Sequence, residues 1–307
     1  FWIAHFVFVK DESLRGGRVL EQAYREHGRL DPDVLPGKRY WTFWLGLLAT
    51  LLVVAGVVFG AWFYVSFVRQ TVVDLAPGLH AVYGGGSNAL VLSGEDGSAV
   101  IDPKFPPGSG SLARWVDRNV TAPTILVNTH YHYDHTLGNE RYADAAIYAH
   151  ARAPDLMLSQ QSDFNDPSWW QSHRESLPDH TVRDSVRLEG GGKVLSLYAA
   201  PVAHTHGDLW AYLPEARVVV TGDIFSNGHY PFFDLSEGGV SIPGLIDVLR
   251  EWSARFPDAT FLPGHGPVAT SGDVDRFADY LEALWRSVQG AHAQGLSETE
   301  AVDTIDL

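Results

Sequence analysis

The feature that most constrains this chain is an apolar stretch near its N-terminus. Residues 41–68, WTFWLGLLATLLVVAGVVFGAWFYVSFV, contain no charged side chain. About 20 such residues suffice for a helix that crosses a bilayer. Trp41 and Trp44 lie at one end of the stretch, and Trp62 and Tyr64 lie at the other, as expected of aromatic side chains at two membrane interfaces. The pattern predicts one transmembrane helix over residues 41–68.

The basic residues around this stretch predict its orientation. Lys38 and Arg39 immediately precede it, whereas Arg69 alone follows it. Because lysine and arginine are enriched on the cytoplasmic side of a membrane span, we expect residues 1–40 in the cytoplasm and residues 69–307 outside it. The chain is therefore expected to be a single-pass, membrane-anchored protein with an extracytoplasmic domain, which would be periplasmic in a bacterium.

Two other interpretations of the apolar stretch stay open. One is a buried core helix, although core helices are seldom so long and so uniformly apolar. The other is a cleaved signal peptide. Its apolar core is usually shorter, and no clear small-x-small cleavage site follows residue 68.

The net charge of residues 69–307 argues against nucleic acids as partners. Residues 69–307 carry 15 Lys/Arg and 31 Asp/Glu, a net charge of −16. So acidic a domain repels a phosphate backbone, and the sequence has no basic patch with interleaved aromatics, so we expect no nucleic-acid partner. The chain contains no cysteine, so any metal site must use His, Asp or Glu. The sequence predicts no oligomeric state.

The segments after residue 69 alternate between short strands and helices. Apolar, β-branched runs between turn residues predict strands, and helical spacing of apolar residues predicts helices. We expect strands at 79–83, 88–93, 98–103, 124–129, 146–150, 185–200 (a hairpin), 209–214, 216–223 and 260–266, and helices at 109–120, 138–145, 243–256 and 273–295. The polar residues 155–180 are expected as a helical insert or a flap. The order fits an α+β domain in which two sheets are sandwiched between helices.

One loop concentrates potential metal ligands. The segment NTHYHYDHTLGN, residues 128–139, contains His130, His132, Asp134 and His135 directly after an apolar strand. In an extended segment, residues two apart point the same way, so His130 and His132 can reach one metal ion together. Asp134 and His135 follow where the next helix begins and can face a second point nearby. Imidazoles and a carboxylate suit Zn²⁺, and also iron or manganese.

One loop supplies at most four ligands, so a catalytic site needs others from distant loops. Candidates lie where expected strands meet loops, the usual place for site residues on a scaffold. PVAHTHGDLW contains His204 and His206, and VVVTGDIF contains Asp223. FLPGHGPV contains His265 between two glycines, which permit close approach of the backbone.

These segments, in this order, resemble the metallo-β-lactamase superfamily. HYHYDH resembles its H-x-H-x-D-H signature, HTHGD its H-T-x-G-D element, TGD its G-D element and PGHG its last histidine. The intervals of 69, 19 and 42 residues between these motifs resemble those of glyoxalase II-like and lactonase-like members. The similarity covers about residues 77–290, and four motifs in order are far more specific than any one of them.

The resemblance implies a four-layer αβ/βα sandwich over residues 69–307, with a two-metal site along one edge. It implies a first metal held by His130, His132 and His204, a second held by Asp134, His135 and His265, and Asp223 shared by both. In such enzymes two metals share a hydroxide that attacks an acyl carbonyl. Asp134 would also orient that nucleophile. The implied protein is a membrane-anchored hydrolase with two zinc ions per chain.

Within the superfamily, the residues favour a small ester, lactone, thioester or amide as substrate. Asp223 occupies the position where typical metallo-β-lactamases carry Cys or Ser, which argues against penicillins as the main substrates. An extracytoplasmic site argues against glutathione thioesters. Two alternatives stay open: a mononuclear iron dioxygenase of the same fold, and a non-catalytic, membrane-anchored metal-binding module.

Neighbours of the motif residues are expected to act around the ligands. The family pattern selects His204 rather than His206, which is expected beside the ligands or in the pocket. Asp208 is expected to orient a ligand histidine or to cap its loop. Tyr131 and Tyr133 are expected to point away from the metals. For His229, substrate contact and a plain surface position are equally open.

Overall fold

In the computed structural model, the chain divides into two compact units, Phe1–Trp62 and Phe63–Leu307. The structure describes residues 26, 37–95 and 97–305. The predicted cytoplasmic segment, residues 1–40, therefore lies almost entirely outside the described residues.

The predicted apolar helix is present. Helix α2 (Gly37–Phe63) continues into a short π-helix, η2 (Tyr64–Val68). The part Trp44–Val68 is long and apolar enough to cross a membrane, with a mean hydropathy of 2.3, and none of its most apolar 18-residue window is buried. So exposed a helix contradicts the core-helix interpretation, because a core helix is covered by protein. A membrane anchor and a signal sequence are both consistent with it.

The second unit contains two mixed sheets. The first has seven strands that pair in chain order: β1 (Thr71–Ala76), β2 (Leu79–Tyr83), β3 (Ala89–Gly94), β4 (Gly97–Ile101), β5 (Pro123–Val127), β6 (Ala146–His150) and β7 (His180–Val182). Neighbours are antiparallel from β1 to β4 and parallel from β4 to β7. Parallel neighbours need crossover connections, and α3 (Gly108–Asn119) supplies the one between β4 and β5.

The second sheet has five strands in the order β12-β11-β10-β9-β8. They are β8 (Ser185–Gly190), β9 (Lys193–Ala199), β10 (Leu209–Leu213), β11 (Val218–Ser226) and β12 (Thr260–His265). β11 and β12 are parallel and are connected through α7 (Ile242–Arg255), while the other neighbouring pairs are antiparallel. Helices α8 (Ser271–Ala293) and α9 (Glu298–Thr304) follow β12.

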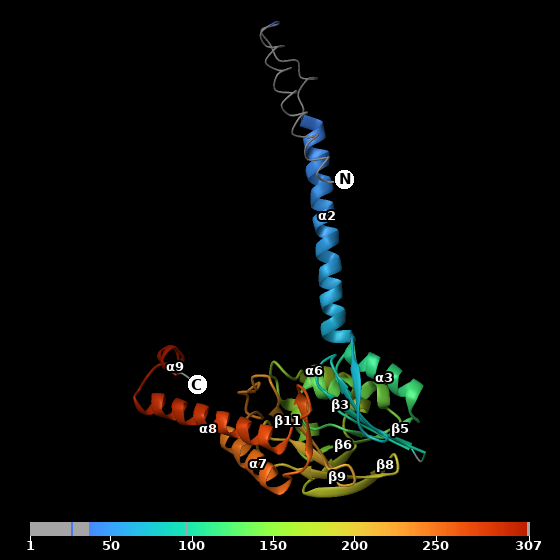
Figure 1. The fold of residues 1–307 in the computed structure, drawn as a ribbon, viewed down its shortest axis with the longest axis vertical. Helices are drawn as coiled ribbons and strands as arrows, with labels where there is room; N and C mark the ends of the chain where they lie inside the picture. The colour runs from blue at the N-terminus through green and yellow to red at the C-terminus, as the bar shows by residue number, and fades with distance from the viewer. Residues whose placement is uncertain (1–25, 27–36, 96, 306–307) are drawn as a thin grey trace. The chain divides into compact units, whose positions relative to one another are not determined.

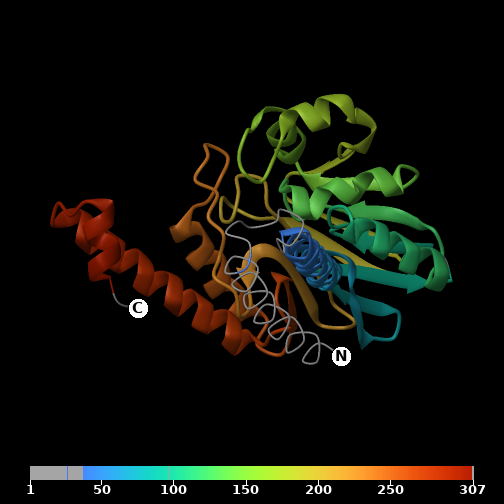
Figure 2. The same cartoon turned by 90° about the horizontal axis from the view of Figure 1, so that it is seen from above.

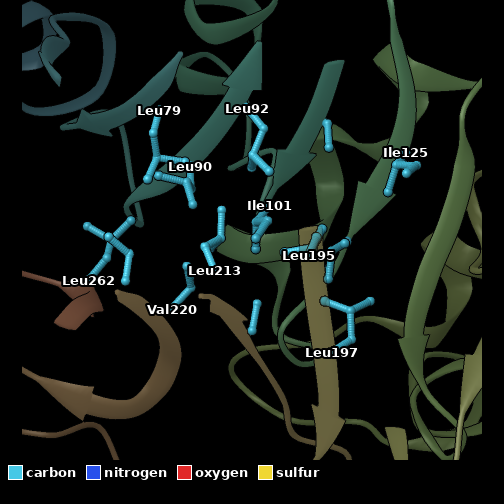
Figure 3. Close-up of a cluster of buried hydrophobic side chains, with 14 of the residues drawn as sticks. Leu79, Leu90, Leu92, Ile101, Ile125, Leu195, Leu197, Leu213, Val220 and Leu262 are labelled. Atoms are coloured by element: carbon cyan, nitrogen blue, oxygen red, sulfur yellow. The ribbon is translucent and has the colours of Figure 1, made fainter. Parts of the chain in front are cut away.

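The two sheets pack face to face over an apolar core. Figure 3 shows this core, which includes Leu79, Leu90, Leu92, Ile101, Leu195, Leu213, Val220 and Leu262. Alternate residues of the same strands point outward, because successive side chains of a strand lie on opposite faces. Val91 and Val100 pack against α3, and Val219 and Phe261 pack against α7 and α8. Helices therefore flank both sheets, with α3 on one side and α7 and α8 on the other (Figures 1 and 2).

Most expected elements are present. The insert at 155–180 is helical, in agreement with one of the two expectations, with α5 (Ala153–Ser159), α6 (Pro167–Ser172) and η4 (Arg174–Ser176) before β7. There are three differences. The helix expected at 138–145 is a 3-10 helix, η3 (Leu137–Tyr142). β11 continues three residues beyond its expected end. The structure also adds β1, β7 and α9, of which β1 has no buried residue and lacks alternating burial.

Candidate metal centre

The predicted ligands meet at one edge of the two sheets. The first sheet supplies four of them from the segment after β5, where α4 (Tyr133–Thr136) begins. The second sheet supplies His204 from the β9–β10 loop, Asp223 from β11 and His265 from the end of β12. Strands far apart in the sequence therefore build one cluster.

The seven side chains form three overlapping groups, and within each group the ligand atoms lie within 4.8 Å of one another. The groups are His130, His132 and His204; Asp134, His135 and His265; and His130, His135 and Asp223, which connects the other two. The structure thus brings all seven residues together. Their roles as metal ligands stay a prediction.

Asp223 lies between the two outer groups. Its Oδ2 is 3.4 Å from Nε2 of His265 in one group and 3.8 Å from Nε2 of His204 in the other, and its Oδ1 is 3.2 Å from Nε2 of His135. The pairing of β11 with β12 is irregular around Gly222, which has a φ of 53°. A Cβ at Gly222 would lie 2.6 Å from the Thr129 side chain, so glycine is required there. Asp223 is thus placed by an irregularity within the strand and not, as predicted, by the strand end.

Three buried atoms at the centre of the cluster have no hydrogen-bond partner among the described residues. They are Nε2 of His130, Nε2 of His135 and Oδ1 of Asp223. His135 and Asp223 lie within ion-pair distance, but their geometry is not that of a hydrogen bond. Since buried polar groups are nearly always hydrogen-bonded, paired or bound to a metal, these converging imidazole and carboxylate atoms fit a divalent cation.

The pKa values of the histidines in the cluster also fit the binding of a cation. Although burial by itself lowers the pKa of His265, the carboxylates of Asp223 and Asp134 raise it to about 10. Burial lowers the pKa of His204 to about 3, so this imidazole is neutral and offers a lone pair. One half of the cluster therefore attracts positive charge, and the other half provides neutral nitrogen donors.

Two carboxylates outside the predicted set hold the ring orientations. Asp102, directly after β4, accepts hydrogen bonds from Nδ1 of His135 (2.8 Å) and from the backbone N–H of Thr129 (2.8 Å). Asp234 accepts a hydrogen bond from the hydroxyl of Tyr131 (2.7 Å) and lies 3.2 Å from Nε2 of His132. These contacts leave Nε2 of His135 and Nδ1 of His132 facing the cluster, as expected of carboxylates that orient metal-binding histidines.

Asp234→Asn is expected to weaken metal binding by about 10- to 100-fold, because loss of an outer partner of a ligand histidine typically costs that much. Hydrogen bonds from His132, Ser236 and Tyr131 outweigh burial and hold the pKa of Asp234 well below its usual range. The substitution removes this charge but keeps the shape. Zinc affinity measured by competition with a chromophoric chelator tests the expectation. Asp247→Asn, on the exposed face of α7, is the matched control. Equal zinc affinity in the two variants would contradict the orienting role.

A buried lysine lies behind the metal loop. Lys104 is fully buried and donates hydrogen bonds to the carbonyl oxygens of Val82 and Ser87. The Ser87 hydroxyl in turn donates to the backbone oxygen of Asp134 (2.7 Å). Burial lowers the pKa of Lys104 to about 7, against the opposing effect of the Asp102 and Asp134 carboxylates. The sequence pattern did not single out Lys104, Asp102 or Asp234.

The residues expected around the ligands have distinct positions. Asp208 caps its loop by accepting hydrogen bonds from the Thr205 backbone N–H (2.8 Å) and hydroxyl (2.5 Å). His206 belongs to none of the three groups found among the described residues. Tyr131 is buried against α5 and α6, whereas Tyr133 contacts the Phe105 ring. His229 is exposed, and its ring lies beside Gly266.

Comparisons with known proteins agree with this architecture. The family model described as "Metallo-beta-lactamase superfamily" matches residues 82–265. An uncharacterized protein of Mycobacterium tuberculosis is 28% identical over 214 residues, which cover 65% of this chain and 94% of that protein. The probable metallo-hydrolase YqgX of Bacillus subtilis is 25% identical over 199 residues, covering 62% of this chain and 92% of that protein. The acyl-coenzyme A thioesterase MBLAC2 of Gallus gallus is 22% identical, covering 59% and 73%.

Solved structures share the fold. The metallo-beta-lactamase from Pontibacter korlensis aligns with a TM-score of 0.56 and 18% identity, covering 70% of this chain and 99% of that one. The DIM-1 metallo-beta-lactamase aligns with a TM-score of 0.55 and 18% identity, covering 70% and 98%. Because the family model matches more than half of the sequence and the structure shows the family's two flanked sheets, this chain belongs to the metallo-beta-lactamase superfamily of metallo-hydrolases.

Proposed function

We propose that this protein is a membrane-anchored hydrolase that uses two divalent metal ions, most suitably zinc, to cleave a small ester, lactone, thioester or amide. The seven residues proposed as ligands are those predicted from the sequence. His130, His132 and His204 would hold one ion, Asp134, His135 and His265 the other, and Asp223 both.

One observation carries this proposal: two groups of three ligand-type side chains lie on either side of Asp223, with buried unpaired atoms between them. A structural metal needs four closed ligands and no open position. Here the side chains of His265 and Asp134 are 24% and 15% exposed, while those of His135 and Asp223 are 0% and 7% exposed. The cluster is therefore reachable from the side of His265, as a catalytic site requires.

The chain's own residues would orient the attacking water and the imidazoles that hold the metals. Bound at this cluster, divalent cations would provide a water of lowered pKa and polarise the acyl oxygen. Asp134 would orient that nucleophile, and the position of its Oδ2, 3.1 Å from Nε2 of His265 at the accessible side, supports this role. Burial alone would raise the pKa of Asp134, but His135 and His265 hold it below its usual range, so this carboxylate is ionised and can accept a hydrogen bond from the attacking water. Asp102 and Asp234 keep the imidazoles in place.

The anchor is part of the proposal. The apolar stretch over residues 41–68 forms an exposed helix, and its flanking Lys38 and Arg39 favour a cytoplasmic N-terminal side. We propose that residues 69–307 lie on the extracytoplasmic side. Protease added to intact spheroplasts should digest this domain, whereas digestion only after lysis would place it in the cytoplasm.

Metal analysis of the full chain in detergent tests the catalytic proposal. After zinc is supplied, we expect about two zinc ions per chain. Hydrolysis of 4-nitrophenyl acetate should be lost with a chelator and restored by zinc. About one iron per chain, with oxygen consumption in place of hydrolysis, would favour the dioxygenase alternative. Bound zinc without hydrolysis of esters, lactones, thioesters or amides would favour the non-catalytic module.

A further inference from the structure

A pocket of about 580 Å³ lies beside the strand end that carries His265, because its lining residue Ser226 pairs with His265. One wall is the end of β11 and the residues after it, from Ser226 to Tyr230, and the other is the N-terminal half of α8. The pocket wall is tied to the cluster, because the backbone N–H of Asn227 donates to the carbonyl oxygen of His265 (3.0 Å). None of the seven proposed ligands lines the pocket. Its volume lies within the range of small-molecule sites.

The lining of this pocket combines three aromatic rings with polar side chains, and the one Lys or Arg side chain of its described residues is ion-paired. Tyr230, Phe277 and Tyr280 provide three rings. Among the described lining residues, Arg276 is the one Lys or Arg side chain, and it forms an ion pair with Asp273, the one acidic residue of the lining. Asp273 also caps α8 through Thr270. Among the described lining residues, the pocket therefore offers the apolar faces of three rings beside polar groups, and no unpaired Lys or Arg side chain for a phosphate or carboxylate.

The other flank of the cluster is apolar too. The ring of Phe164 lies 4.8 Å from that of His132 and 6.0 Å from that of Phe232. Phe232 and Leu235 are 64% and 87% exposed, and Tyr230 is 84% exposed. Large apolar side chains gathered at a surface commonly mark a binding site. The segment after β11 thus presents apolar side chains toward solvent beside the cluster.

We propose that the pocket between residues 226–230 and α8 receives an uncharged hydrocarbon chain or ring of the substrate. This inference rests on the proposed hydrolase and names its substrate class: neutral acyl esters or lactones with an apolar group. Anionic thioesters such as acyl-coenzyme A are disfavoured, since their phosphates would approach a domain with a net charge of −16.

Ester chain length tests the proposal in the zinc-loaded full chain. With 4-nitrophenyl acetate, butanoate and hexanoate, kcat/KM should rise about two- to fourfold for each added methylene that becomes buried. Tyr230→Ala should reduce the ratio of kcat/KM for the hexanoate to kcat/KM for the acetate. Because Tyr230 is exposed, the substitution should leave the fold intact, so a lower ratio would not result from unfolding. Val288→Ala, at a 41% exposed site on α8 outside the pocket, is the matched control and should keep the wild-type ratio. Two outcomes would overturn the pocket assignment and leave the proposed hydrolase standing. One is a kcat/KM that does not rise with chain length, and the other is the same hexanoate-to-acetate ratio in Tyr230→Ala and Val288→Ala.

The charge of the substrate is tested separately. The neutral hexanoyl thioester of 2-mercaptoethanol should be cleaved with a higher kcat/KM than hexanoyl-coenzyme A. A preference for the coenzyme A thioester would overturn the neutral substrate class.

A binding experiment without catalysis separates this inference from the proposed function. In chelator-treated full chain, an alkyl diazirine ketone should photolabel residues 226–230 or 273–280, and excess 2-octanone should suppress that labelling. Competed labelling in this pocket supports the inference even if no ester is hydrolysed, an outcome that would count against the proposed function alone. Labelling elsewhere only would overturn the inference.

Discussion

Asp223→Asn is expected to lose most bound metal and to lower kcat/KM for ester hydrolysis by more than about 100-fold, the upper end of what loss of an outer partner costs. The side chain approaches both groups of the cluster, with its Oδ1 3.2 Å from Nε2 of His135 and its Oδ2 3.8 Å from Nε2 of His204. An amide of the same shape carries no charge and presents one N–H₂ group toward histidines that need an acceptor. Elemental analysis of zinc per chain and steady-state kinetics measure the two effects.

Asp247→Asn again provides the control, because it makes the same chemical change at an exposed position on α7. It should keep wild-type zinc content and activity. If Asp223→Asn retained about two zinc ions and full activity, the carboxylate would have no role between the two groups, and the dinuclear proposal would be wrong.

Gly264→Ala substitutes no residue of the cluster, but it is expected to displace the side chain of Asp223. A Cβ at residue 264 would lie 1.8 Å from Oδ1 of Asp223 and 2.8 Å from the backbone carbon of Gly222. Such overpacking typically costs about 1–3 kcal/mol of stability. We therefore expect a fall in Tm of roughly 2–4 °C for each kcal/mol, together with loss of zinc. Circular dichroism and elemental analysis measure these changes.

Gly290→Ala is the matched control for this substitution. No atom lies within 4 Å of a Cβ at Gly290, in the interior of α8, so alanine there should be neutral or stabilising by up to about 1 kcal/mol. A second test uses the Asp223→Ala background. Because the closest clash is with the Asp223 side chain, the stability cost of Gly264→Ala should shrink when that side chain is absent. An unchanged cost would place the strain elsewhere in β12.

The ligand-type residues were predictable because each lies in a short local sequence pattern next to or within an apolar strand or its loop. His130 and His132 are two apart in one segment, and His265 stands between glycines after an apolar strand. The two-sheet core was predictable for a similar reason, since alternating apolar residues in β2 to β4 serve both faces of the first sheet.

The supporting residues were not predictable, because their roles depend on contacts across the fold. Asp234 reaches His132 from 102 residues away, and Asp102 reaches His135 from 33 residues away. Neither lies in a local pattern that separates it from an ordinary loop aspartate. Lys104 would be expected at the surface, yet it is fully buried beneath the metal loop. β1 was missed since an exposed edge strand needs no apolar alternation.

The division of the cluster between the two sheets has a thermodynamic consequence. Four of the side chains follow β5 of the first sheet, and three belong to the second sheet, so the full set exists only when the sheets have docked. An ion bound here would act as a cross-link between the two halves of the sandwich. Linkage then adds about 4 kcal/mol of stability when free metal exceeds its Kd by about 1,000-fold. Metal supply would therefore set the free energy of unfolding of the domain as well as its catalytic rate.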